Sequence, residues 1–319
     1  MQRRVFVQFA VASLAADLSA GWVRRGECAS AKSMDVVAFR AARRFIELEH
    51  GRIAYVERGT GQAALFLHGL PLNGFQWRGA IERLCVHRRC IAPDFMGLGY
   101  SEISESQSVA PKDQVAMLAA LLDKLSLRKV DIVANDSGGG VAQLFLARHP
   151  ERVRTLLLTN CDVEPDSPPV KLKPVIEMAR AGTLAGAIEK LVHDKARARA
   201  AFANTYRDPG NFTDEAIEHY FTPLLSSPLR RAQYHAYQAA LDPNPLAGIE
   251  ARLKHSSTPV RMVWGMRDEF FPPADAEYLD CIFPQSRGIR RVAEGKLFFP
   301  EEYPDILAEE AQRLWSVKA

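Results

Sequence analysis

The chain has 319 residues, of which 47% are hydrophobic and 25% are charged, as is usual for a globular enzyme. Its formal net charge of +3 is small and its basic residues are scattered, which argues against nucleic acid as a partner. No segment holds the roughly 18 uninterrupted apolar residues that a membrane-spanning helix requires, so no membrane partner is expected.

The N-terminal 33 residues can be interpreted in two ways. Arg3 and Arg4, followed by the apolar stretch Phe9–Ala16, resemble a twin-arginine export signal. Asp17 argues against an export signal, because a charged residue is unfavourable in the apolar region of such a signal. The alternative is that Met34 is the natural start and that the preceding residues are a non-structural leader. We favour this second interpretation, and therefore a cytoplasmic location over export.

Eight segments have the pattern of β-strands. Arg44–Glu49 and Arg52–Arg58 alternate in polarity around a His-Gly pair and predict a hairpin. The other six are short, largely apolar runs: Ala63–Leu67, Arg89–Pro93, Val130–Val133, Val153–Thr159, Val260–Trp264 and Ile289–Val292. Helical patterns such as Asp113–Leu125 and Val141–Arg148 separate most of them. The sequence therefore predicts an α/β fold with a mostly parallel, doubly covered sheet of about eight strands.

A long stretch between the sixth and seventh strands has no strand pattern. Ala179–His193, Asp214–Tyr220 and Pro228–Leu241 have helical periodicity and are separated by Pro and Gly. These segments predict a helical cap inserted into the α/β core. The expected parts of the chain are a leader or signal-like segment (1–40), a core in two pieces (41–164 and 246–319) and the cap (165–245).

Residues 130–148 form a strand pattern that ends in small residues and continues as a helix pattern. This arrangement predicts a nucleophile elbow, in which the central residue is held in a strained conformation above the sheet. Small residues must flank that residue because strand and helix nearly touch there. Ala134 and Gly138 provide such flanks around Asp136, whereas the flanks of Ser137 are less suitable. We therefore expect Asp136 to be the nucleophile.

Three further motifs accompany the elbow. In chain order they are Leu65–Pro71 with Trp77 and Arg78 behind it, Pro93–Ser101, and Thr258–Asp268. Together with the elbow they resemble the α/β-hydrolase fold family, in particular the haloalkane dehalogenase and epoxide hydrolase branch, over roughly residues 43–316. The resemblance implies an aspartate that attacks carbon and an alkyl-enzyme ester that water then hydrolyses. It also implies Asp268 as the catalytic acid, which Asn160 at the end of the sixth strand supports.

The resemblance breaks at the position of the catalytic histidine. When Glu301–Pro304 is aligned on the acidic end of the family's last motif, Leu297 occupies that position, and no histidine follows His255. The imidazole normally deprotonates the hydrolytic water, which contributes roughly 100- to 10,000-fold. We therefore expect impaired or altered turnover. Asp136 and Asp268 would also face one pocket without an imidazolium between them. Two like charges so placed raise the pKa of a carboxyl group.

The groups that stabilise the leaving group also depart from the family pattern. The backbone N–H groups of Leu70 and Ser137 can form an oxyanion hole. Dehalogenases commonly carry Asn and Trp there, so halide binding by these two side chains is lost. Epoxide hydrolases use cap tyrosines instead, and four are available, although packing is the commoner role: Tyr206, Tyr220, Tyr234 and Tyr237. The other candidates for substrate contact are His68, Trp77, Asn135 and Asn160.

Three functional interpretations stay open. The first is an enzyme, an α/β-hydrolase with an aspartate nucleophile acting on a small, largely apolar epoxide, halide or ester-like substrate. The second is a non-hydrolytic ligand-binding protein on the same fold, and the third is an esterase or lyase dependent on Ser137. All three imply a small hydrophobic substrate or ligand. No cofactor or metal is expected, and the oligomeric state is not predicted. We favour the first interpretation.

Overall fold

The computed structural model describes residues 34–316, so the leader or export signal expected within residues 1–33 lies outside the described residues. The described fold begins within the segment that is expected to extend to residue 40. Helix α1 spans Val36–Ala42, and its Phe39 is buried at 2% exposure. The carboxylate of Asp35 accepts the N–H of Ala38 at 2.8 Å and so caps the helix.

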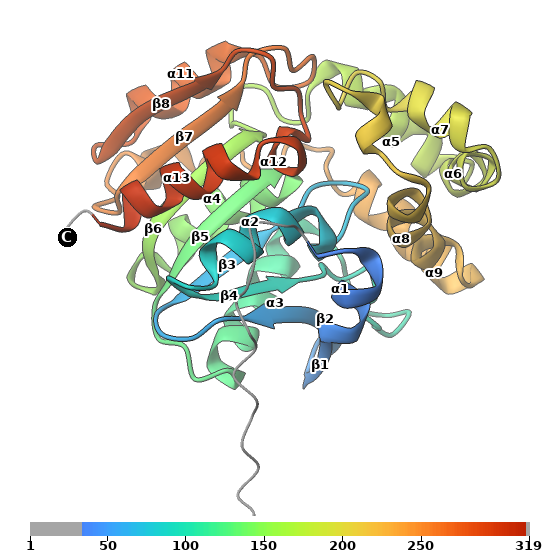
Figure 1. The fold of residues 1–319 in the computed structure, drawn as a ribbon, viewed down its shortest axis with the longest axis horizontal. Coiled ribbons are helices and arrows are strands. Elements are labelled where there is room, and N and C mark those ends of the chain that lie inside the picture. Colours follow the sequence, from blue (N-terminus) through green and yellow to red (C-terminus); the bar gives the residue numbers. More distant parts are fainter. Residues whose placement is uncertain (1–33, 317–319) are drawn as a thin grey trace, which may run out of the picture.

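Eight strands form one sheet in the order β1-β2-β4-β3-β5-β6-β7-β8 (Figure 1). Their bounds are β1 Arg43–Leu48, β2 Gly51–Arg58, β3 Ala63–Leu67, β4 Arg89–Pro93, β5 Val130–Asp136, β6 Val153–Cys161, β7 Val260–Gly265 and β8 Ser286–Val292. β2 is antiparallel to both of its neighbours, and all other pairs are parallel. The predicted α/β class with a mostly parallel sheet of about eight strands is confirmed.

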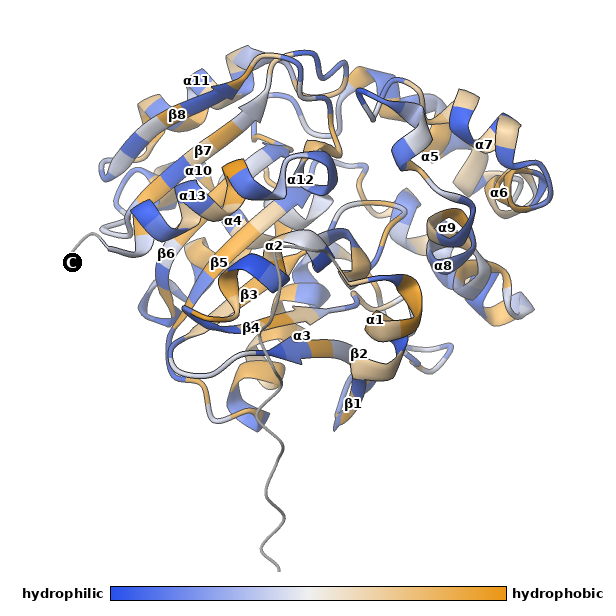
Figure 2. Ribbon diagram, viewed as in Figure 1, coloured by the Kyte–Doolittle hydropathy of each residue, from blue (hydrophilic) through white to orange (hydrophobic). Residues whose placement is uncertain are grey.

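Helices cover both faces of the sheet. Their bounds are α2 Arg78–Leu84, α3 Pro111–Lys124, α4 Ser137–Arg148, α10 Glu250–Leu253, α11 Pro273–Ile282, α12 Phe299–Glu302 and α13 Pro304–Trp315. α2 packs against α13 on one face, and α3 packs against α4 on the other (Figure 1). β3 and β5 are buried along their whole length, and β6 almost so, which explains why β3 and the middle of β5 and β6 are mostly apolar (Figure 2).

The helical cap lies between β6 and β7 in the chain and stands to one side of the sheet (Figure 1). Its helices are α5 Lys173–Arg180, α6 Leu184–His193, α7 Lys195–Ala201, α8 Asp214–Leu225 and α9 Pro228–Ala239. The single helix predicted for Ala179–His193 is wrong, because Gly182 has a φ of +71° and separates α5 from α6. None of the helices within residues 34–316 is long and apolar enough to span a bilayer.

Candidate active site

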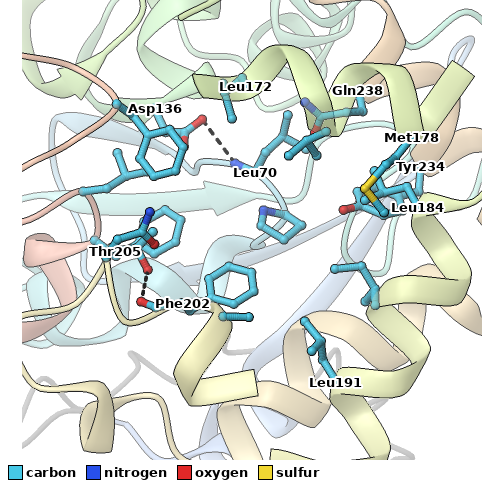
Figure 3. A pocket seen from close by; sticks show the side chains of 18 of the residues that line it. Leu70, Asp136, Leu172, Met178, Leu184, Leu191, Phe202, Thr205, Tyr234 and Gln238 are labelled. Carbon is cyan, nitrogen blue, oxygen red and sulfur yellow. Dashed lines mark hydrogen bonds between the residues drawn. The ribbon is translucent and has the colours of Figure 1, made fainter. Parts of the chain in front are cut away.

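The turn between β5 and α4 is strained at its central residue. Asp136 has φ 55° and ψ −134°, a conformation that is costly for any residue with a Cβ atom. The unusual backbone angles expected at Asp136 are therefore present. Its side chain is 5% exposed and lines a cavity between the core and the cap (Figure 3).

Glycines allow the elbow to fit against the neighbouring loop. A Cβ atom at Gly138 would lie 2.5 Å from the carbonyl oxygen of His68, and one at Gly69 would lie 2.5 Å from the Cβ atom of Asp136. Neither contact is tolerable, so the close approach of α4 and the loop after β3 requires glycine at both positions. The small flank predicted at residue 138 has this physical cause.

Two backbone N–H groups converge on one oxygen of Asp136. Leu70 donates to Oδ1 at 3.4 Å (Figure 3). Ser137, the first residue of α4, donates to the same oxygen. The structure thus brings together the two groups that the sequence predicts as an oxyanion hole. They would also polarise the carbonyl of any ester formed through Oδ2.

Burial raises the pKa of Asp136 to about 7, against an ordinary value near 4, and the charge of Asp268 raises it further. The N–H groups of Ser137 and Leu70 act in the opposite direction. Burial likewise raises the pKa of Asp268 to about 7, although nearby N–H groups, first that of Phe270, oppose this. The charge of Asp268 therefore acts on Asp136, although Asp268 is not among the residues that line the cavity.

One oxygen of Asp268 has no partner. Oδ1 accepts the N–H of Phe270 at 2.8 Å, whereas Oδ2 is buried and forms no hydrogen bond with any residue of the described chain. All eight histidines of the sequence lie within residues 34–316, and none hydrogen-bonds Asp136 or Asp268. Leu297 is 4% exposed and lines the cavity together with Asp136. Within residues 34–316, therefore, no histidine is hydrogen-bonded to either carboxylate.

The residues expected to contact substrate are not at the cavity wall. His68, Trp77, Asn135 and Asn160 are completely buried, and none is among the residues that line the cavity. The imidazole of His68 bridges backbone groups, because its Nε2 accepts the N–H of Phe95 at 3.0 Å and its Nδ1 lies 3.0 Å from the carbonyl of Gly69. Trp77 packs against the ring of Phe66. These two side chains support the site rather than line it.

The two asparagines fix the loops that carry the site. Asn135 donates to the carbonyl oxygen of Leu297 at 3.1 Å and so holds that residue beside the elbow. Asn160 accepts the N–H of Gly265 at 2.6 Å and donates to its carbonyl at 3.0 Å, which fixes the end of β7 ahead of Asp268. Because their polar atoms are engaged in this way, the expected role in substrate contact is not supported for either residue.

The cavity measures about 330 Å³ and is mostly apolar. Its apolar wall comes from the loop after β3, the cap and the last loops of the core: Leu70, Pro71, Leu172, Val175, Met178, Leu184, Ile188, Leu191, Ala201, Phe202, Phe270, Phe271, Leu297 and Phe298. Asp136 is the one charged residue among those that line it within residues 34–316. This composition suits a small hydrophobic molecule.

Of the four cap tyrosines considered above, Tyr234 lines the cavity (Figure 3). Tyr206 donates its hydroxyl to Glu301 at 2.8 Å, and Arg78 donates to the hydroxyl of Tyr220 at 3.4 Å. Tyr237 is buried beside Ser137. Packing or ion-pair support is therefore the observed role of three of these tyrosines.

The loop that carries Leu297 is joined to the cap. Lys296 donates to the carbonyl of Ala203 at 2.6 Å, and Phe298 donates its N–H to the carbonyl of Thr205 at 2.9 Å. Immediately beyond it, Glu302 accepts further hydrogen bonds from the cap residues Arg207, Asp208 and Asn211. This loop therefore helps to hold the cap on the core.

Two groups near the site were missed from the sequence. Asp162, just after β6, is buried, and its pKa is raised to about 7 by burial and by the charge of Asp136. Gln238, on α9, lines the cavity (Figure 3). An acidic residue at the end of a strand is a sequence feature from which Asp162 could have been predicted. No local motif marks Gln238, because the face of a cap helix that turns inward depends on how the cap packs on the core.

Comparisons with known proteins agree with the fold. The family model described as the alpha/beta hydrolase fold matches residues 64–303. Haloalkane dehalogenase 2 of Mycobacterium tuberculosis is 26% identical over 269 residues, which cover 83% of this chain and 92% of that protein. A cis-3-alkyl-4-alkyloxetan-2-one decarboxylase of Shewanella oneidensis is 27% identical over 241 residues, covering 72% and 74%.

A solved structure shows the same fold. The epoxide hydrolase CorEH superimposes with a TM-score of 0.71 at 20% identity, covering 86% of this chain and 98% of that one. At this identity the likeness concerns the fold alone. The family model, by contrast, spans most of the chain, including the elbow and the loop with Leu297. The chain therefore belongs to the α/β-hydrolase fold family.

Proposed function

We propose that Asp136 is a nucleophile that attacks an electrophilic carbon of a small, largely apolar epoxide, alkyl halide or ester-like compound. The observation that carries this proposal is the carboxylate itself, held on a strained elbow at the wall of an apolar cavity. Its Oδ1 is fixed by two N–H groups, which leaves Oδ2 to form the new bond. Attack then gives an alkyl ester on Asp136.

Release of that ester is the slow part of the proposed reaction. Water must be deprotonated as it attacks, and neither carboxylate has a histidine within hydrogen-bond distance. We therefore infer that the protein alkylates readily and hydrolyses the ester slowly. This combination distinguishes the proposal from a pure binding protein, which would form no ester.

The direct test is the intact mass of the protein after incubation with 1-bromohexane, 1,2-epoxyhexane and hexyl acetate. The expected increase is one hexyl group from 1-bromohexane, the whole molecule from 1,2-epoxyhexane, or one acetyl group from hexyl acetate, which releases hexanol. At least one of these adducts should form and be located at Asp136 by peptide mapping. Asp136→Asn should give no adduct, because an amide oxygen is a poor nucleophile. Unmodified wild-type protein across the panel would contradict the proposal.

The alternative based on Ser137 has a distinct outcome. The Oγ atom of Ser137 is buried near Tyr237, and this residue does not line the cavity, which favours Asp136. Ester hydrolysis that disappears in Ser137→Ala but persists in Asp136→Asn would establish the serine alternative instead.

The pH dependence of alkylation follows from the environment of Asp136. The attacking form is the carboxylate, and burial raises the pKa of this group to about 7. The alkylation rate should therefore rise about tenfold per pH unit between pH 5 and 6 and level off above pH 8. The measurement is the rate of adduct formation from pH 5 to 9. A rate that is constant from pH 5 upwards would mean an ordinary, low pKa.

A second candidate reaction needs no hydrolytic base, and the absence of a base beside Asp136 favours it. The name of the Shewanella relative contains an oxetan-2-one, a four-membered cyclic ester. Asp136 would attack the saturated ring carbon that is bonded to the ring oxygen, not the carbonyl carbon. The C–O bond breaks and frees a carboxylate. That carboxylate then leaves as CO₂, its C–C bond pair forms an alkene, and Asp136 departs as a carboxylate. Turnover to alkene and CO₂ without a lasting adduct would support this candidate.

A further inference from the structure

Gln238 places an unpartnered amide at the wall of the cavity. The residue belongs to α9 and is 3% exposed, and its Nε2 atom is buried without a hydrogen-bond partner among the described residues. Figure 3 shows this amide at the cavity that Asp136 also lines. The amide is therefore placed to meet a ligand, which would supply the missing hydrogen-bond partner.

Another glutamine of the same helix shows the usual behaviour. Gln233 is also buried, but its amide donates to the carbonyl of Ile103 at 3.1 Å and accepts from Arg230 at 3.1 Å. Buried amides are nearly always paired in this way, since an unpaired one loses its bonds to water without replacement. The unpaired amide of Gln238 therefore indicates a site for a polar group of a ligand.

The position of α9 places Gln238 near the reacting carboxylate. Tyr237, the preceding residue, has its pKa raised partly by the charge of Asp136, so this turn of the helix lies close to the elbow. Tyr234, one helical turn earlier, lines the same cavity. The rest of the wall is mostly apolar, so few other side chains could orient the polar end of a substrate.

We propose that Gln238 binds the leaving group of the substrate and thereby orients the carbon for attack by Asp136. This inference rests on the proposed function. As the bond from Oδ2 to carbon forms, the carbon–halogen bond or the carbon–oxygen bond of the ring breaks, and its electron pair departs on the halide or oxygen. An N–H of Gln238 donates to that atom, whose growing charge strengthens the hydrogen bond. The side chains of Leu70 and Ser137 lie at positions where dehalogenases commonly use Asn and Trp.

The kinetic test compares variants in the alkylation of Asp136 by 1-bromohexane. Gln238→Met keeps the volume and removes the hydrogen bond, so the rate should fall about tenfold. Gln238→Glu is nearly isosteric but replaces the donor by a carboxylate, and the rate should fall further. Leu229→Met lies on the same helix but is 37% exposed and outside the cavity wall, so it should stay within about twofold of the wild type. Thermal melts check that each variant is folded.

A binding test works without any covalent chemistry. Gln238→Met should weaken binding of 1-hexanol about tenfold while leaving binding of hexane unchanged, because only the alcohol has a group for the amide. Equal weakening for both ligands would show a packing role and overturn the inference, as would an unchanged preference for the alcohol. If wild-type protein forms no adduct, the proposed function fails, and the binding comparison still decides whether Gln238 anchors a polar group.

Discussion

Replacing Leu297 by histidine is expected to shorten the lifetime of an ester on Asp136 by about 100- to 10,000-fold, the range that a general base contributes. The structure offers the new ring an orienting partner, because Oδ2 of Asp268 is buried and unpaired and can accept an N–H from the imidazole. Leu297 is held beside the elbow by its carbonyl contact with Asn135, which does not depend on the side chain. The measurement is the decay of adduct mass after excess alkylating agent is removed.

Two controls separate base catalysis from a change of shape. Leu297→Phe also introduces a ring but no base, so its ester should persist as in the wild type. Leu297→His combined with Asp268→Asn has the base without its charged partner, and should lose a large part of the acceleration. Equal ester lifetimes in the histidine and phenylalanine variants would show that Leu297 does not occupy the position of a base.

Arg78→Met is expected to destabilise the protein by about 3–5 kcal/mol, because it leaves the buried carboxylate of Glu301 without its counter-ion. The side chains of Arg78 and Glu301 are 16% and 2% exposed. Burial opposes the charge of Arg78, but the neighbouring charge of Glu301 more than compensates and raises the pKa of the guanidinium. Glu301 also accepts a hydrogen bond from the hydroxyl of Tyr206 in the cap. Arg78→Met should therefore weaken the contact between core and cap as well.

The measurement is the free energy of unfolding from urea titration. Arg291→Met provides a matched control, because it removes an ion pair with Glu277 in which the side chains are 51% and 61% exposed. Its effect should not exceed about 1 kcal/mol. Arg78→Met combined with Glu301→Gln should recover part of the loss, since no buried charge is then unpaired. A loss below about 1 kcal/mol in Arg78→Met alone would contradict the proposed role of this pair.

The elbow could be predicted from the sequence because it is a local feature. A strand that enters a helix within a few residues requires small neighbours, and Gly138 meets backbone atoms that leave no room for a Cβ. The position of Leu297 could be predicted for a related reason, since the acidic residues and the proline that follow it fix the alignment. Both conclusions depend on spacing along the chain rather than on tertiary contacts.

The directions of side chains could not be predicted in the same way. His68 and Asn160 are polar residues at strand ends, where substrate contacts are common, yet they bond to backbone groups of loops distant in sequence. Gln238 and Gln233 lie on one helix with the same side chain, and only the docking of the cap decides which one faces the cavity. The break of the cap helix at Gly182 was missed because an isolated glycine is also tolerated within helices.

The two N–H groups on Oδ1 of Asp136 also affect how long a covalent adduct survives. Once Oδ2 carries an alkyl group, Oδ1 becomes the carbonyl oxygen of an ester, and the same N–H groups stabilise the negative charge that develops there when water attacks. If the proposed ester forms, the folded protein therefore activates its own adduct even without a base. Unfolding removes these donors, so the same ester is expected to be chemically more durable in the denatured chain than in the native protein.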